Sequence, residues 1–234
     1  MASRIVAIDG PSGSGKSSTG LAVARALGFA HLDSGALYRA LTLMALNETP
    51  PQGDGASDPD IEPLALLDHA ERRGLHLERS GESFEPMLDG LPLGNAIRGS
   101  EVTAWVSAVS AVPAIRDWVN AQLRAVAARG IPVVVDGRDI GTIVFPEAPL
   151  KVFLTAGPEA RARRRLLQRG QEIDRDTLRR ETEALAARDR ADSARPVAPL
   201  RQAKDAVLLD GTDLSLDDQV AAIVKLAKER LKAK

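Results

Sequence analysis

The first residues whose types and spacing suit chemistry form a glycine-rich segment. Residues 10–17 read Gly-Pro-Ser-Gly-Ser-Gly-Lys-Ser and match the G-x-x-x-x-G-K-[ST] spacing of a phosphate-binding P-loop. Glycines let backbone N–H groups turn toward phosphates, Lys16 would reach the β- and γ-phosphates, and Ser17 would hold Mg²⁺. The segment therefore predicts a bound nucleoside triphosphate with Mg²⁺. The residues expected to contact ATP are Gly10, Pro11, Ser12, Gly13, Ser14, Gly15, Lys16, Ser17 and Ser18.

A second anion site is indicated at residues 32–39, which read Leu-Asp-Ser-Gly-Ala-Leu-Tyr-Arg. An apolar run ends just before a helical stretch, so Ser34 lies at the helix N-terminus and Arg39 about one turn later. This arrangement suits a second phosphate group. It suits equally well a capped helix with a surface arginine, since Ser34 is a good N-cap residue. These residues alone leave both interpretations open.

A third polar segment follows the apolar run Val-Val-Val at residues 133–135. A strand that ends in Asp136 has the form of a Walker B element, which supports Mg²⁺ directly or through water. Open α/β sheets bind ligands beyond the carboxyl ends of their strands. Arg138 and Asp139, which come next, are therefore expected to grip a charged substrate.

The fourth segment is a series of arginines and aspartates in the last third of the chain. Arg161, Arg164 and Arg165 fall on one helical face by their i, i+3, i+4 spacing. A formal net charge of −1 and only 3% aromatic residues argue against nucleic acid as the partner. In a chain with a P-loop, such arginines are expected to supply positive charge to a transferring phosphoryl group. The series comprises Arg161, Arg163, Arg164, Arg165, Arg169, Arg188, Asp189, Arg190, Asp192 and Arg195.

Short apolar strands alternate with helical stretches, which predicts an α/β fold with a parallel sheet to position these segments. The strands are expected at residues 5–8, 30–32, 131–135, 150–154 and 206–209. A final helix is expected at 216–231, with Ser215 as its N-cap.

Residues 60–95 interrupt this alternation and predict a small β-rich insert. A Gly-, Pro- and Asp-rich loop at 47–59 comes first, followed by a short helix at 63–73 and alternating segments at 75–78 and 84–88. Asp89-Gly90 is a hairpin turn signal. Pro113 is expected to end or kink the helical run 101–126.

Composition limits the remaining possibilities. The 234 residues are 44% hydrophobic and 27% charged, as in a globular protein of one or two domains. There is no cysteine, hence no disulfide or thiolate metal site. His31, His69 and His76 show no metal-ligand spacing and are expected at the surface or its boundary. No signal segment and no apolar run of about 20 residues occurs, which predicts a soluble, cytoplasmic chain.

Together these motifs resemble bacterial cytidylate kinases, on residues 8–19, 33–39, 136–146 and 195–200. The resemblance spans essentially the whole chain and implies ATP + CMP ⇌ ADP + CDP, with Mg²⁺ as cofactor and dCMP as a further substrate. It implies a P-loop kinase core of five parallel strands flanked by helices, at 1–45 and 100–234. It further implies an arginine-rich helical lid at about 157–190 and a CMP-side insert at 46–99. A monomer without nucleic-acid or membrane partners is expected.

The resemblance also implies roles for individual residues. Ser34, Arg39 and Arg138 resemble contacts to the CMP phosphate and the ribose side. Ser107, Arg116 and Asp139 resemble residues that read cytosine, whose exocyclic amine donates to hydroxyl or acidic acceptors. Arg188 and Asp192 resemble contacts to the ribose hydroxyls, and Arg195 one to the phosphate region. The expected catalytic residues are Lys16, Arg138, Arg161 and Arg165, and the expected metal ligands are Ser17 and Asp136.

Three other functions remain to be weighed. Another small P-loop kinase would act on a different monophosphate or on a hydroxyl acceptor. A GTPase-like switch would need D-x-x-G and N-K-x-D motifs, and neither occurs in the sequence. A P-loop protein without turnover would keep Lys16 but would not need Arg39, Arg138 and Asp139.

Overall fold

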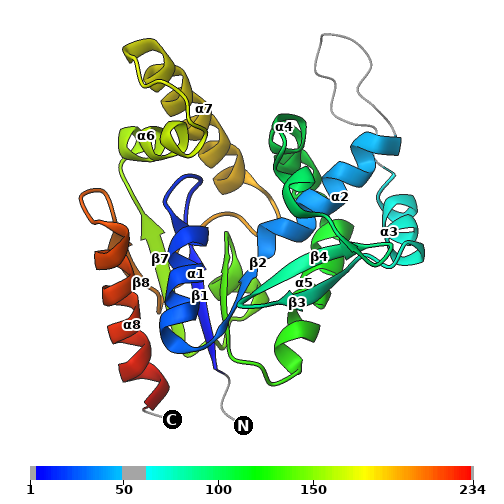
Figure 1. The fold of residues 1–234 in the computed structure, drawn as a ribbon, viewed down its shortest axis with the longest axis horizontal. Helices are drawn as coiled ribbons and strands as arrows, with labels where there is room; N and C mark the ends of the chain where they lie inside the picture. Colours follow the sequence, from blue (N-terminus) through cyan, green and yellow to red (C-terminus); the bar gives the residue numbers. More distant parts are fainter. Residues whose placement is uncertain (1–3, 49–61, 233–234) are drawn as a thin grey trace. The chain divides into compact units, whose positions relative to one another are not determined.

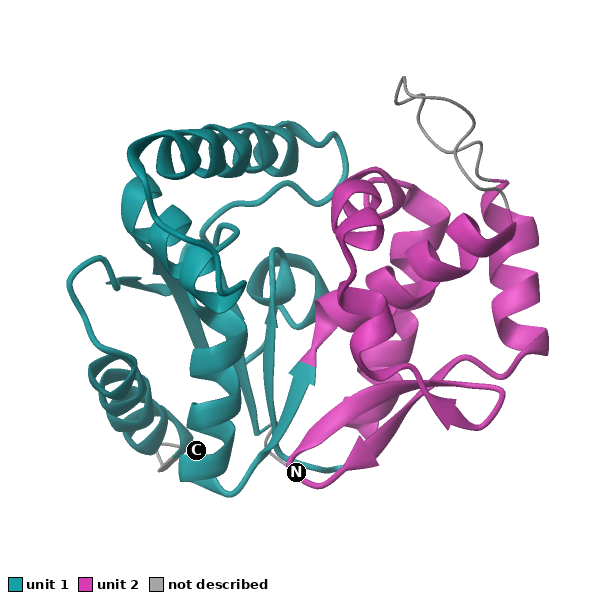
Figure 2. Cartoon of the chain, turned by 45° about the horizontal axis from the view of Figure 1, so that its top comes forward, with its two compact units in different colours: residues 1–32, 130–234 teal, residues 33–129 magenta. Residues whose placement is uncertain are grey.

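The computed structural model describes residues 4–48 and 62–232. The chain divides into two compact units, which Figure 2 distinguishes by colour. Unit 1 comprises residues 1–32 and 130–234, and unit 2 comprises residues 33–129. The predicted insert at 46–99 falls within unit 2, which also includes residues 33–45 and 100–129.

Five neighbouring strands in the order β2-β6-β1-β7-β8 organise unit 1, as part of a sheet of eight strands (Figure 1). β1 is parallel to β6 and β7, and β7 is parallel to β8. Valine and isoleucine dominate the central strands, as expected for strands that are covered on both faces. The predicted α/β fold with parallel central strands is confirmed, whereas the predicted number of five strands is too low, because the sheet has eight strands and includes antiparallel pairs. The five neighbouring strands are β1 (Ile5–Asp9), β2 (Ala30–Asp33), β6 (Val133–Gly137), β7 (Leu150–Thr155) and β8 (Val207–Asp210).

Helices α1 (Lys16–Leu27) and α8 (Leu216–Lys232) pack together over this sheet (Figure 1). Their apolar side chains meet those of the strands in one buried core, of which Ile8, Val152 and Ile223 are examples. Ser215 caps α8 as predicted, because its Oγ accepts from the Asp218 N–H at 3.1 Å. The remaining helices of unit 1 are η2 (Ile140–Val144), α6 (Pro158–Gln168) and α7 (Arg175–Ala194).

The described residues of unit 2 form three antiparallel strands and four α-helices. Strand β3 pairs with β4, and β4 pairs with β5. Asp89 (φ 52°) and Gly90 (φ 75°) make the tight turn between β4 and β5, which confirms the predicted hairpin. The elements are α2 (Ser34–Glu48), α3 (Pro63–Arg72), β3 (His76–Ser80), β4 (Ser83–Leu88), β5 (Leu91–Pro92), η1 (Gly94–Arg98), α4 (Ser100–Val109) and α5 (Pro113–Ala128).

Several predicted boundaries change in the structure. Pro113 is the first residue of α5 and separates it from α4, as predicted. Asn47 and Glu48 are helical and end α2, whereas the rest of the predicted loop at 47–59 lies outside the described residues. Ser34 is the first residue of α2 rather than its N-cap. Asp33 takes that place, because its Oδ1 accepts from the Gly35 N–H at 2.9 Å. No helix in the described ranges has the length and apolar character that a membrane span requires.

Candidate active site

The glycine-rich loop connects β1 to α1, which is the context that the sequence predicts for a P-loop. Gly10, Gly13 and Gly15 all have positive φ, at 154°, 76° and 95°. A Cβ on Gly10 would lie 2.0 Å from the carbonyl oxygen of Leu154 in β7, so no larger residue fits there. The chain can therefore turn sharply after the carboxyl end of β1 and direct its N–H groups toward an anion at the start of α1.

Lys16, the first residue of α1, lies within this loop and is 5% exposed. Its Nζ donates to the Pro11 carbonyl oxygen at 2.7 Å and to Ser14 Oγ at 3.5 Å. Burial, reinforced by the positive charge of Arg138, lowers the pKa of Lys16 to about 7. An anion beside this ammonium group would stabilise its charged form.

Ser17 and Asp136 meet at the carboxyl ends of the parallel strands. Ser17 Oγ donates to Asp136 Oδ2 at 2.7 Å, and His31 Nε2 lies 2.7 Å from Asp136 Oδ1. Burial alone would raise the pKa of Asp136, but the hydrogen bond and charge interaction with His31, together with Lys16, hold it below its usual value. A hydroxyl and an ionised carboxylate are the hard oxygen donors that Mg²⁺ prefers. The pair therefore fits a Mg²⁺ that is also held by phosphates.

Asp9 anchors the segment that follows Asp139. Its Oδ1 accepts from the Ile140 N–H at 2.8 Å, and its Oδ2 accepts from the Gly141 N–H at 2.7 Å. Burial raises the pKa of Asp9 to about 6, although these two N–H groups oppose the increase. Because Asp9 holds the first turn of η2, it also fixes the backbone next to Asp139. Asp139 is itself buried, with an exposed fraction of 5%.

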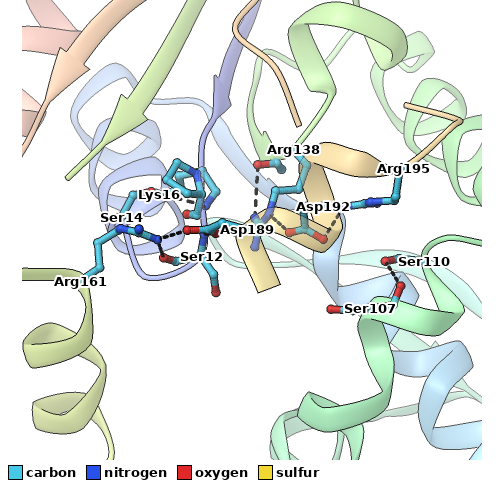
Figure 3. Close-up of polar contacts among 12 residues, drawn as sticks. Ser12, Ser14, Lys16, Ser107, Ser110, Arg138, Arg161, Asp189, Asp192 and Arg195 are labelled. Carbon is cyan, nitrogen blue, oxygen red and sulfur yellow. Dashed lines mark hydrogen bonds and ion pairs between the residues drawn. The ribbon is translucent and has the colours of Figure 1, made fainter. Parts of the chain in front are cut away.

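Arg161 of α6 contacts the backbone of the P-loop (Figure 3). It donates to the carbonyl oxygens of Ser12 and Ala156, both at 2.9 Å, and pairs with Asp189 of α7. Asp189 completes the cluster, because its Oδ1 accepts from the Ser12 N–H at 3.1 Å. The arginine and the aspartate thus hold both the N–H and the carbonyl of one P-loop residue.

Two neighbouring arginines of α6 also reach this loop. Arg165 donates to Ser12 Oγ at 3.1 Å and pairs with Glu181 at 3.0 Å. Arg164 donates to the Ser14 carbonyl oxygen and to carbonyl oxygens of the loop between β8 and α8. The helical face that the arginine spacing predicts therefore lies against backbone of unit 1.

A second cluster in unit 1 centres on Asp192 of α7 (Figure 3). Arg138 Nε lies 3.0 Å from Asp192 Oδ2, and Arg195 Nη2 lies 2.6 Å from Asp192 Oδ1. Burial alone would raise the pKa of Asp192, but the charges of Arg138, Arg195 and Arg188 hold it below its usual value. The structure thus brings together predicted residues that are up to 57 positions apart, namely from 138 to 195.

Unit 2 carries the other predicted contact residues. Arg39 of α2 donates to Thr103 Oγ1 at 3.0 Å and to the Ile97 carbonyl oxygen at 3.3 Å. Ser34, five residues earlier on the same helix, is 6% exposed. The start of α2 is therefore tied to η1 and α4 through the arginine.

Arg116 and Ser107 come from α5 and α4. Arg116 is 2% exposed, donates to the Ser110 carbonyl oxygen at 2.9 Å, and stacks 5.6 Å from the centre of the Tyr38 ring. The Ser107 carbonyl oxygen accepts from Ser110 Oγ at 3.1 Å. Within unit 2, Ser110 thus connects the two helices that carry the predicted cytosine-reading residues.

Comparison with known proteins identifies the family to which this chain belongs. The cytidylate kinase family model matches residues 6–229. The chain belongs to the cytidylate kinase family. It is 42% identical to the cytidylate kinase of Rhodococcus opacus over 228 residues, which cover 97% of this chain and 96% of the relative. It is 45% identical to that of Exiguobacterium sp. over 228 residues, which cover 96% of each.

Among solved structures, a shikimate kinase from Bacteroides thetaiotaomicron matches with 19% identity and a TM-score of 0.41, covering 97% of this chain and 98% of that one. Membership of the cytidylate kinase family makes the protein a nucleoside monophosphate kinase, a phosphotransferase, and supports phosphorylation of CMP with ATP.

Several residues that the structure places at the site of this cytidylate kinase family member have no role predicted from the sequence. His31 is 6% exposed and contacts Asp136, so its expected surface position is wrong. Asp189 was visible in the charged series but had no assigned partner. Asp9 had a usable signal, since it is the one charged residue in an otherwise apolar strand that leads into the P-loop.

Proposed function

We propose that the protein transfers the γ-phosphoryl group of ATP in line to CMP and dCMP, with the assistance of Mg²⁺. The observation that best supports this is the order of groups in unit 1. Lys16 and Ser17 follow the carboxyl end of β1, and Asp136 and Arg138 lie at the carboxyl end of β6. Asp192 of α7 joins this group by pairing with Arg138 and Arg195. Phosphoryl transfer depends on such positioning and charge neutralisation.

The P-loop would hold the phosphoryl donor. Its N–H groups and Lys16 would bind the β- and γ-phosphates of ATP. Ser17 and Asp136 would hold Mg²⁺, directly or through water, and the bound metal would neutralise phosphate charge. The Arg161–Asp189 pair would keep the backbone of Ser12 in place while this happens.

The acceptor phosphate needs positive charge rather than a base, because it is already ionised near neutral pH. Arg39, Arg138 and Arg195, together with Ser34, are proposed to hold it in line with the donor. Asp192 supports this role for two of them, since its two oxygens fix the guanidinium groups of Arg138 and Arg195.

Arg161 and Arg165 are proposed to neutralise the transferring group and help exclude water. Arg165 is the better placed to move toward a phosphate, since its partners at Ser12 and Glu181 are side chains. Arg161 is held by two backbone carbonyls and Asp189, which favours a role in shaping the loop.

An assay across acceptors tests the proposed reaction. Coupled ADP release would be measured with CMP, dCMP, UMP, AMP and GMP, with and without Mg²⁺. We expect turnover with CMP and dCMP that requires the metal. Turnover with a different monophosphate alone would favour another small P-loop kinase, and nucleotide binding without ADP release would favour a protein without turnover.

Asp139 is proposed to read cytosine, together with Ser107 and Arg116. Replacing Asp139 with alanine should raise the KM for CMP about tenfold, because one base contact accounts for about 1–3 kcal/mol of discrimination. The KM for ATP should stay nearly unchanged. Steady-state kinetics with each substrate varied in turn would measure both values. Asp117→Ala, an exposed change on α5, is the matched control. Equal increases in both KM values would contradict the role.

Asp192 is proposed, with Arg188, to contact the ribose hydroxyls. Asp192→Ala should reduce kcat/KM for both CMP and dCMP, because Arg138 and Arg195 lose their anchor. It should reduce the value for CMP about tenfold more, since a hydrogen bond to a charged group contributes about 1.5–3 kcal/mol.

The ratio of the two kcat/KM values is the diagnostic quantity for Asp192. Arg195→Ala provides the comparison, because it removes a phosphate contact that both nucleotides share and should leave the ratio unchanged. A wild-type ratio in Asp192→Ala would remove the ribose contact from the proposal.

A further inference from the structure

His31 in β2 is a buried imidazole of unit 1. The residue is 6% exposed, and its Nε2 lies 2.7 Å from Oδ1 of Asp136. A carboxylate can only accept, so Nε2 carries the hydrogen of this bond. A polar ring at this depth is costly unless its hydrogen bond is used, and here the partner is a residue assigned to the metal.

The carboxylate of Asp136 is held on both sides. Oδ1 faces His31 in β2, and Oδ2 accepts from Ser17 Oγ in α1 at 2.7 Å. The imidazole therefore fixes the rotation of the carboxylate about its Cβ–Cγ bond and directs its second oxygen to Ser17. Three elements, β2, β6 and α1, meet in this one chain of contacts.

Helix α1 has a glycine where the imidazole of His31 approaches it. Gly20 lies one turn after Ser17 on α1, and a Cβ there would come within 3.1 Å of His31 Nε2 and 3.2 Å of its Cδ2. Gly20 itself does not have a positive φ, so its backbone does not call for glycine. The absence of a side chain at this position is explained by the close approach of the ring.

We propose that His31 is a positioning residue that orients Asp136 toward Ser17 and thereby sets how strongly Mg²⁺ tightens nucleotide binding. This rests on the assignment of Ser17 and Asp136 to Mg²⁺ in the proposed function. Groups that orient metal-binding residues typically contribute about 10–100-fold in metal affinity or activity.

The test measures binding rather than turnover. The Kd of the ATP analogue AMP-PNP would be determined by calorimetry in EDTA and in Mg²⁺, and the ratio of the two values gives the tightening by the metal. His31→Leu should reduce this ratio about tenfold and leave the Kd in EDTA near that of the wild type. His31→Gln should restore most of the ratio, because its amide nitrogen can donate from a similar place. His76→Gln, an exposed histidine change, is the matched control.

Gly20→Ala gives a second, independent variant if His31→Leu does not fold, as judged by circular dichroism. Its methyl group has to displace the imidazole by a few tenths of an ångström, so the ratio should fall in the same direction but by less. The proposal is overturned if folded His31→Leu keeps the wild-type ratio. It is also overturned if His31→Leu or Gly20→Ala weakens binding equally in EDTA and in Mg²⁺, which would mark a purely structural role.

The experiment distinguishes a failure of the Mg²⁺ assignment from a failure of the role of His31. If Mg²⁺ does not tighten binding in the wild-type protein, then the assignment of Ser17 and Asp136 to the metal falls, and the role of His31 falls with it. If the wild-type protein responds to Mg²⁺ and His31→Leu responds equally, only the role of His31 is lost.

Discussion

Replacement of Lys16 with alanine should lower kcat by at least about 100-fold, as expected when one donor to the developing charge of a transition state is removed. Lys16 lies inside the P-loop, where its Nζ contacts the Pro11 carbonyl oxygen and Ser14 Oγ. The ammonium group is therefore held at the point where the loop would surround the β- and γ-phosphates. Steady-state ADP release with CMP would measure kcat.

Lys225→Ala is the matched control for this prediction, because Lys225 is exposed on α8. It should leave kcat unchanged. Near-normal turnover in folded Lys16→Ala would contradict the assignment of the P-loop to phosphoryl transfer.

The same lysine predicts a pH dependence of nucleotide binding. With its pKa lowered to about 7, Lys16 is largely neutral at pH 8 in the free protein. Bound phosphates favour the charged form and raise the pKa, so ADP binding at pH 8 should take up a proton and weaken as pH rises above about 7.

Calorimetry at pH 8 in buffers of different ionisation enthalpy would give the number of protons taken up. The wild-type protein should take up close to one proton, and Lys16→Ala none. Equal uptake by both proteins would assign the proton to another group.

Local patterns in the sequence predicted the parts of the site that depend on neighbouring residues. The P-loop, the turn at Asp89-Gly90 and the start of α5 at Pro113 are each determined by backbone preferences of a few adjacent residues. The five strands of unit 1 could also be recognised, because each is a short apolar run bounded by polar residues.

Contacts between distant residues could not be predicted in this way. His31 belongs to a β-strand and Asp189 to a polar helix, and nothing near either in the sequence indicates a partner. Their roles depend on which strand lies next to β2 and which face of α7 meets the P-loop. Arg161 shows the same limit, since its spacing predicted a charged face, whereas the structure buries that charge against Ser12 and Asp189. The start of α2 was misplaced by only one residue, yet this transferred the capping role from Ser34 to Asp33.

Gly10→Ala should be among the most damaging single changes in unit 1. The added Cβ would lie 2.0 Å from the Leu154 carbonyl oxygen, a backbone atom of β7 that cannot rotate away. The end of β1 or of β7 must therefore shift, and the P-loop shifts with it. Displacement of catalytic groups by about 1 Å can cost on the order of 100-fold in rate. We expect a loss of that size in kcat/KM for ATP, together with a lower Tm.

Gly28→Ala is the matched control for Gly10→Ala, because it introduces backbone strain without a steric clash. Gly28 also has a positive φ, at 67°, but a Cβ there meets nothing within 4 Å. It should lower stability by about 1 kcal/mol through its left-handed conformation alone and leave kcat/KM for ATP unchanged. Thermal unfolding and steady-state kinetics on both variants would make the comparison. If Gly10→Ala resembled Gly28→Ala in both measurements, the close approach of β1 and β7 would not be what shapes the phosphate-binding loop.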